Sequence, residues 1–200
     1  MSDASGQSVP LEVRRRKPMT TLQDDKKTLA ALAAALIEQP RATLQELAEA
    51  IGVSKATLYR FCGTREDLIG RLLTHGCDSL NQALLDADLA TGSARDGLRR
   101  LIDGQLAHKE LLAFLTYYWQ PESLNEQIQA KSWHEYEVGV DQFFLKGQRE
   151  GAFRIDISAQ AMNEALTWLI VGLVDGARRG RIARANLAQM VESLFLDGAK

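Results

Sequence analysis

Hydrogen-bond donors and positive charges gather in one short stretch of this chain, Ser54 to Arg60. Apart from Leu58, its side chains are small, hydroxylic, phenolic or basic: Ser54, Lys55, Ala56, Thr57, Tyr59 and Arg60. No acid interrupts them, although a solvated helix face usually mixes both signs of charge. Such groups can donate hydrogen bonds to phosphate oxygens and to the edges of bases. Double-stranded DNA is therefore the partner that this stretch predicts.

The stretch before it predicts a short helix. Thr43 and Glu46 form a capping box, in which the Thr side chain accepts from the amide at the third helical position and the Glu side chain reaches back to the cap. Leu44, Leu47 and Ala48 then give this helix one apolar stripe.

A tight turn and a second helix follow. Gly52, between Ile51 and Val53, can take the positive φ that a sharp helix exit needs. Ser54 is a good N-cap for the next helix, which would bury Leu58 and Phe61. Two short helices joined in this way form a helix-turn-helix, whose second helix enters the major groove of DNA.

This stretch resembles the helix-turn-helix of the tetracycline-repressor-like (TetR/AcrR) regulators. The resemblance covers about a quarter of the chain. In place of the family's His-Phe pair and following Lys, this chain has Phe61-Cys62 and Arg65. The matching residues are Leu47-Ala48, Gly52-Val53-Ser54, Leu58-Tyr59 and Arg65-Glu66-x-Leu68.

The resemblance implies a dimeric DNA-binding regulator, most often a repressor, whose C-terminal part binds a small-molecule effector. It also implies phosphate contacts for Tyr59 and Arg65, to which we add Thr43. We expect Lys55, Thr57 and Ser54, at the start of the second helix, to contact bases.

Residues 1–19 predict a disordered basic arm that ends in Arg14, Arg15, Arg16 and Lys17. We expect these cations to contact DNA beside the helix-turn-helix; the alternative is a solubilising tail. The charge distribution agrees in sign, because residues 1–75 carry 11 Lys and Arg against 9 Asp and Glu, whereas the remainder carries 13 against 17.

Four prolines and few alternating β-branched runs predict an all-α protein, and the helical spacing along the chain predicts about nine helices. We expect a three-helix DNA-binding domain over residues 20–70 and a helical effector-binding and dimerisation domain over residues 71–200. No apolar run is long enough to cross a membrane, so we expect a cytoplasmic protein. Two cysteines, Cys62 and Cys77, predict no disulfide framework, and no spacing suggests a metal or a cofactor.

The second half of the chain is rich in aromatic residues that could line an effector pocket. Aromatic side chains at helical spacing more often form a core, so this assignment competes with simple packing. The candidate ligand-binding residues are Tyr117, Tyr118, Trp119, Trp133, His134, Phe144 and Trp168.

The last two predicted helices would form the dimer interface. The first, capped by Ser158, has apolar residues on nearly all sides, which predicts burial on nearly all sides. A four-helix bundle with a second subunit would provide that burial; a core within one chain is the alternative. The candidate interface residues are Leu169, Gly172, Leu173, Gly176, Leu187, Met190, Val191 and Leu194.

Two other functions stay open. One is a helix-turn-helix regulator that responds to a protein partner rather than to a small ligand. The other is an all-α enzyme, which the sequence disfavours because no phosphate-binding loop or nucleophile-base arrangement is recognisable.

Overall fold

The structure, a computed structural model, describes residues 26–118 and 127–199, and these form helices and connecting turns without a strand. This confirms the all-α fold predicted from the sequence. Nine helices follow one another in the described residues: α1 (Lys26–Glu38), α2 (Leu44–Ala50), α3 (Lys55–Phe61), α4 (Arg65–Asp86), α5 (Ala94–Ala107), α6 (Lys109–Tyr118), α7 (Gln127–Arg149), α8 (Ala159–Arg178) and α9 (Leu187–Ala199).

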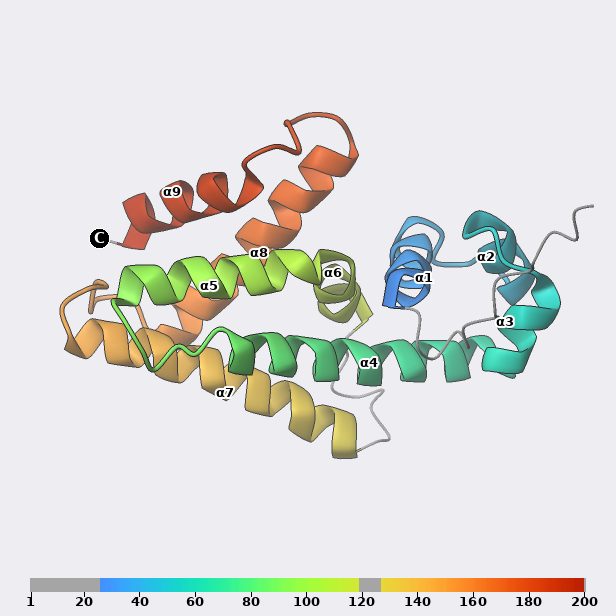
Figure 1. The fold of residues 1–200 in the computed structure, drawn as a ribbon, viewed down its shortest axis with the longest axis horizontal. Coiled ribbons are helices and arrows are strands. Elements are labelled where there is room, and N and C mark those ends of the chain that lie inside the picture. The colour runs from blue at the N-terminus through green and yellow to red at the C-terminus, as the bar shows by residue number, and fades with distance from the viewer. Residues whose placement is uncertain (1–25, 119–126, 200) are drawn as a thin grey trace, which may run out of the picture.

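Helices α1, α2 and α3 lie together at one end of the molecule (Figure 1). Leu32 and Leu36 of α1, Leu47 of α2 and Leu58 of α3 are fully buried there. By their sequence, Thr21 and Asp24 are expected to cap the first helix, and both lie outside the described residues.

Helix α4 runs from this end along the molecule to the bundle formed by α5 to α9 (Figure 1). Thr64 caps it, accepting a hydrogen bond of 3.0 Å from the amide of Asp67. The spacing of Leu80, Leu84 and Leu85 predicts that this helix continues to about Leu89, but it ends at Asp86, and Leu85 is 73% exposed. The last turn of α4 therefore extends beyond the core in which its earlier apolar residues, up to Leu80, are buried.

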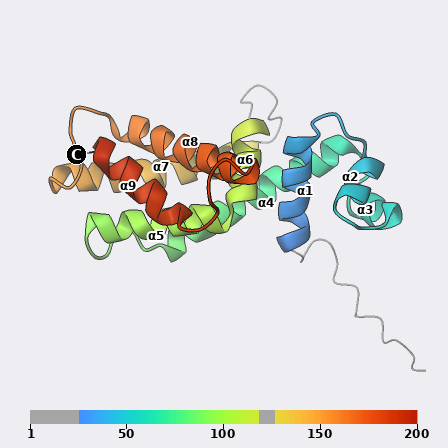
Figure 2. The ribbon, with the colours of Figure 1, turned by 90° about the horizontal axis from the view of Figure 1, so that it is seen from above.

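The opposite end is a bundle held by α7, which packs against both α4 and α8. Its core contains a cluster of four phenylalanine rings: Phe143, Phe144 and Phe153 contact one another, and Phe195 contacts Phe144, with centroids 5.2 to 5.7 Å apart. Helix α6 packs on α1, and two perpendicular views show this junction between the two ends of the molecule (Figure 1 and Figure 2).

Helix α8 differs from the sequence-based expectation. It begins after the predicted cap Ser158, but it is not buried on nearly all sides, because Ala161, Ala165, Trp168 and Gly172 form an exposed line along it. Nothing in the described part of the chain covers this line. No helix in the described residues is long and apolar enough to span a membrane.

Candidate DNA-binding and effector sites

The predicted capping box and turn are both present. The Thr43 hydroxyl accepts from the amide of Glu46 at 3.3 Å, and the Glu46 carboxylate accepts from the amide of Thr43 at 2.7 Å. Gly52 has a φ of 72°, a left-handed conformation that favours glycine. The turn therefore has the geometry that the sequence predicts.

Helix α3 has one side packed against the rest of the chain and one side exposed to solvent. The Ser54 hydroxyl accepts from the amide of Thr57 at 3.1 Å and caps the helix. Leu58 and Cys62 are buried under it. The exposed side chains are those of Ser54, Lys55, Ala56, Tyr59 and Arg60, with Thr57 half-buried among them.

The outer surface of α3 is held in place by contacts between its polar groups. Lys55 Nζ donates to Gln45 Oε1 at 3.1 Å and lies 5.4 Å from the centre of the Tyr59 ring. The hydroxyls of Ser54 and Thr57 are 2.7 Å apart. Gln45 was not predicted from the sequence; the only available signal is its polar side chain on the exposed face of α2.

Arg65 has partners within the chain. One guanidinium nitrogen donates to the carbonyl of Pro40 at 2.5 Å and lies 3.5 Å from the hydroxyl of Tyr118. Its Nε is buried without a hydrogen-bond partner among the described residues. The side chain thus joins α4 to the end of α1 and to α6, and the expected phosphate contact stays a prediction. Arg14, Arg15, Arg16 and Lys17 lie outside the described residues.

The two cysteines are free and buried. Burial raises the pKa of Cys62 to about 11 and that of Cys77 to about 12, so both stay protonated thiols at neutral pH. No group of His, Cys, Asp and Glu in the described part of the chain could hold a metal ion.

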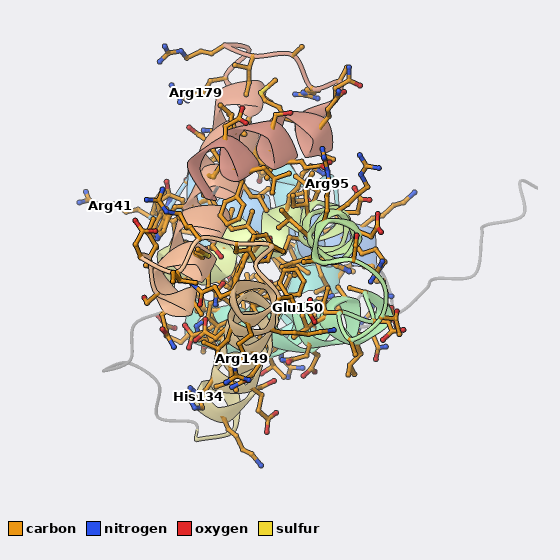
Figure 3. All side chains as sticks on the ribbon, turned by 90° about the vertical axis from the view of Figure 1, so that its left-hand side faces the viewer. Arg41, Arg95, His134, Arg149, Glu150 and Arg179 are labelled. Carbon is orange, nitrogen blue, oxygen red and sulfur yellow. The ribbon has the colours of Figure 1, made fainter. Side chains whose placement is uncertain are left out.

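The structure does not bring the candidate ligand-binding aromatics together. Tyr117 and Trp168 are half-exposed or more, and His134 is exposed at the edge of the bundle (Figure 3). Phe144 belongs to the phenylalanine cluster, and the hydroxyl of Tyr118 donates a hydrogen bond to the carbonyl of Leu36 in α1. Trp119 lies outside the described residues. These side chains lie on different helices and point in different directions. Their spacing along the sequence therefore could not show which of them lie close together. Trp133 is the member that lies beside buried polar groups.

Buried polar groups do meet between α5 and α7. Gln105 Nε2 donates to the hydroxyl of Tyr136 at 2.6 Å, and Trp133 Nε1 donates to Glu137 Oε1 at 2.8 Å. Burial raises the pKa of Tyr136 to about 12 and raises the pKa of Glu137. The sequence held one signal for this pair: Gln105 continues the buried spacing of Leu98, Leu101 and Ile102 on α5.

Comparison with known proteins identifies relatives of this chain. The chain is 46% identical over 181 residues to the HTH-type transcriptional regulator NfxB of Pseudomonas aeruginosa, an alignment that covers 90% of this chain and 97% of NfxB. The solved structure of the TetR-like regulator LfrR of Mycobacterium smegmatis, in complex with proflavine, matches with a TM-score of 0.64 over 86% of this chain and 94% of LfrR, at 23% identity.

The chain belongs to the TetR/AcrR family of helix-turn-helix transcriptional regulators. Another TetR family regulator, PfmR of Thermus thermophilus, has the same fold, with a TM-score of 0.63 and 19% identity over 87% of this chain and 99% of PfmR. No protein-family model matches. The relatives are regulators rather than enzymes, which confirms that this TetR-like chain is not an enzyme.

The candidate dimer residues of this TetR-like chain fall into two groups, one buried within its own chain and one exposed or half-buried. Val191 is fully buried in its own chain, and a Cβ on Gly176 would lie 3.4 Å from Ile182 of the same chain, so neither faces outward as expected. The rest of the set is exposed or half-buried: Leu169, Gly172, Leu173, Leu187, Met190 and Leu194. Together with Trp168 of α8, we call these apolar residues of α8 and α9 the α8–α9 face.

Proposed function

We propose that the protein is a cytoplasmic, homodimeric transcriptional repressor that binds an operator through α3 and releases it when a small-molecule effector binds. The observation that carries this proposal is the acid-free outer surface of α3, whose Lys55 is held by Gln45 at 3.1 Å. A side chain held in place loses less conformational entropy when it contacts a base.

Within this proposal, residues 20–70 form the DNA-binding domain and residues 71–200 the effector-binding and dimerisation domain. Lys55, Thr57 and Ser54 contact base edges in the major groove. Tyr59 and Thr43 donate to phosphates and fix the position of α3 on the duplex. The arm before α1 adds phosphate contacts.

The α8–α9 face supports the dimer. It combines Trp168, 50% exposed, and Leu194, 54% exposed, with an open glycine at 172. A second copy of this face would bury these groups by two-fold symmetry and would present two α3 helices to two half-sites one helical turn apart.

An effector can act because α4 and α6 connect the two ends of the molecule. Helix α4 begins beside α3 and packs on α7, and α6 packs on α1. A ligand that prefers one arrangement of these helices shifts the dimer away from the spacing that the operator requires, by an amount set by its differential affinity. LfrR was solved with proflavine, which supports a small organic effector here.

The test is fluorescence anisotropy of the purified protein with duplex DNA from upstream of its own gene and with a scrambled duplex. We expect tight binding to the first and weak, salt-sensitive binding to the second. Proflavine, kept below the concentration that changes the anisotropy of either free duplex, should then lower the affinity for the upstream duplex more than that for the scrambled duplex. Equal binding to both duplexes across all salt concentrations would contradict the proposal.

A further inference from the structure

Gln105 carries an unsatisfied acceptor in the interior of the molecule. The side chain is 1% exposed, and its Oε1 has no hydrogen-bond partner among the described residues, although Nε2 is bonded to Tyr136. Turning the amide over would only move the deficit to the NH2 group. An unmade buried hydrogen bond costs about 1 to 3 kcal/mol, so this amide points to a donor that the described chain does not supply.

A connected series of aromatic and polar side chains on α7 extends from this amide toward a half-buried carboxylate. The Tyr136 ring stacks on Trp133, with centroids 5.4 Å apart and an interplanar angle of 29°. Trp133 in turn donates its indole N–H to Glu137. Gln105, Tyr136, Trp133 and Glu137, which we call the α5–α7 cluster, therefore form one connected set.

The outer end of this cluster is negatively charged. No Lys or Arg of the described residues lies within ion-pairing distance of Glu137. Glu164 and Asp141 both add to the negative potential around it, and His134 is the one nearby group that opposes them. Asn163 of α8 joins that helix to α7, donating to Asp141 Oδ1 at 3.0 Å and to the carbonyl of Glu137 at 3.4 Å.

We propose that the α5–α7 cluster recognises the effector and that the effector is a planar aromatic cation bearing an N–H group. Glu137 pairs with the positive charge, the rings of Trp133 and Tyr136 pack against the aromatic system, and Gln105 Oε1 accepts from the N–H. A half-buried carboxylate without a basic partner gains most from a cation, and aromatic rings add cation–π attraction. This inference rests on the proposed function, because it assigns the effector site of that regulator.

The experiment titrates proflavine, a planar aromatic cation, into the full-length protein and follows its fluorescence. Glu137→Gln keeps the shape and the hydrogen-bond acceptor but removes the charge, and we expect it to weaken binding about tenfold or more. Glu135→Gln is the matched control, since Glu135 lies exposed on the same helix and pairs with Lys131 at 3.7 Å. It should leave proflavine binding unchanged.

Gln105→Leu tests the inner end of the cluster. It removes the unsatisfied Oε1 but also the hydrogen bond to the buried Tyr136 hydroxyl, so it should lower the melting temperature and weaken proflavine binding, whereas Tyr136→Phe, which removes the same hydrogen bond but keeps Oε1, should lower the melting temperature alone. Unchanged proflavine binding in Gln105→Leu would contradict the role of Gln105 as an anchor. Neutral acridine, titrated at mildly basic pH, should bind equally well to the wild type and to Glu137→Gln.

Operator affinity without ligand separates the two proposals. All of these variants should bind the upstream duplex as the wild type does, since none lies near α3. If the wild type binds its operator but does not bind proflavine, or if Glu137→Gln and Glu135→Gln bind proflavine equally, the effector site is wrong and the regulator stands. If the wild type does not distinguish the upstream duplex from the scrambled one, the proposed function itself fails.

Discussion

The hydroxyl of Tyr118, in the last turn of α6, donates a hydrogen bond of 3.0 Å to the main-chain carbonyl of Leu36 in α1. The same hydroxyl lies 3.5 Å from the guanidinium of Arg65, the first residue of α4. Three helices from the two ends of the molecule thus meet at one phenolic oxygen. A displacement of α6 would therefore act on α1 and α4 together.

Tyr118→Phe should loosen this junction without removing the ring, which stacks on Phe114 at 4.6 Å. We expect a loss of about 1 kcal/mol in the free energy of unfolding, the usual value for one hydrogen bond. If the proposed coupling runs partly through this contact, the effector should then reduce operator affinity several-fold less than in the wild type. Tyr117→Phe, on the exposed neighbouring residue, is the control and should change neither quantity.

The polar groups of α3 should separate into two classes when mutated. Lys55→Ala and Thr57→Ala should weaken operator binding by about 1 to 3 kcal/mol and change scrambled DNA little, since they remove base contacts. Tyr59→Phe should weaken both duplexes by similar factors, because a phosphate contact carries no sequence information. Anisotropy titrations measure all of these. Uniform losses for Lys55→Ala across all sequences would remove it from the base-contacting set.

Gln45→Ala gives a separate check of how Lys55 is held. Freeing Lys55 Nζ from Gln45 should lower operator affinity by a few-fold at most, less than Lys55→Ala itself, because only the ordering of the side chain is lost. A loss larger than that of Lys55→Ala would assign the DNA contact to Gln45 instead.

Gly172 tests the α8–α9 face. A Cβ at Gly172 or at Gly70 meets no atom of the described chain within 4 Å, and both glycines lie in helices. Leucine at either position should therefore leave the chain folded. Gly172→Leu should shift the proposed dimer toward monomer in analytical ultracentrifugation, because the proposal places a second subunit there, whereas Gly70→Leu should not. Dimers of unchanged stability in Gly172→Leu would place the interface elsewhere.

Acid should weaken the attachment of α9 to α5. The buried carboxylate of Glu192 accepts from Arg95 at 3.0 Å and from Arg99 at 3.1 Å (Figure 3 shows Arg95 near α9). These bonds, that from Arg95 first, lower the pKa of Glu192 below its ordinary value of 4.5. The folded chain therefore holds the proton less tightly than the unfolded chain, and this contribution is complete above pH 4.5 and lost as pH falls through the lowered pKa.

Glu192→Gln should remove part of that acid sensitivity. Both arginines are largely exposed and screened by solvent, so we expect a loss of about 1 kcal/mol at neutral pH, with a smaller decline in acid than the wild type shows. Urea unfolding at several pH values measures this. Glu150→Gln, on an exposed residue 3.9 Å from Lys146, is the control and should follow the wild-type curve.

The features that the sequence predicted best are local ones, which depend on residues close together in the chain. The capping box at Thr43, the glycine turn at Gly52 and the caps Ser54 and Ser158 depend on neighbours within four positions, and the structure has all of them. A buried face also follows from local spacing, which is why Leu58 was placed correctly beneath α3.

Features that join distant segments could not be predicted in this way. Arg65 reaches Pro40, 25 positions earlier, and Tyr118, 53 positions later, so its orientation depends on how α1 and α6 pack. The pairing of Gln105 with Tyr136 likewise depends on how α5 and α7 are placed in the bundle. The apolar line on α8 was visible in the sequence, but periodicity does not tell whether its own chain or a second subunit covers it.

The most direct test of the central claim is selection of bound duplexes from a random-sequence DNA library, with the wild type and with a Lys55→Ala, Thr57→Ala double variant. A dimer that contacts bases through α3 should enrich an inverted repeat whose half-sites lie about one helical turn apart, and the double variant should lose that sequence while it still binds DNA weakly at low salt. Failure of the wild type to enrich any sequence, or enrichment of the same repeat by the double variant, would contradict the assignment of α3 as the DNA-recognition helix.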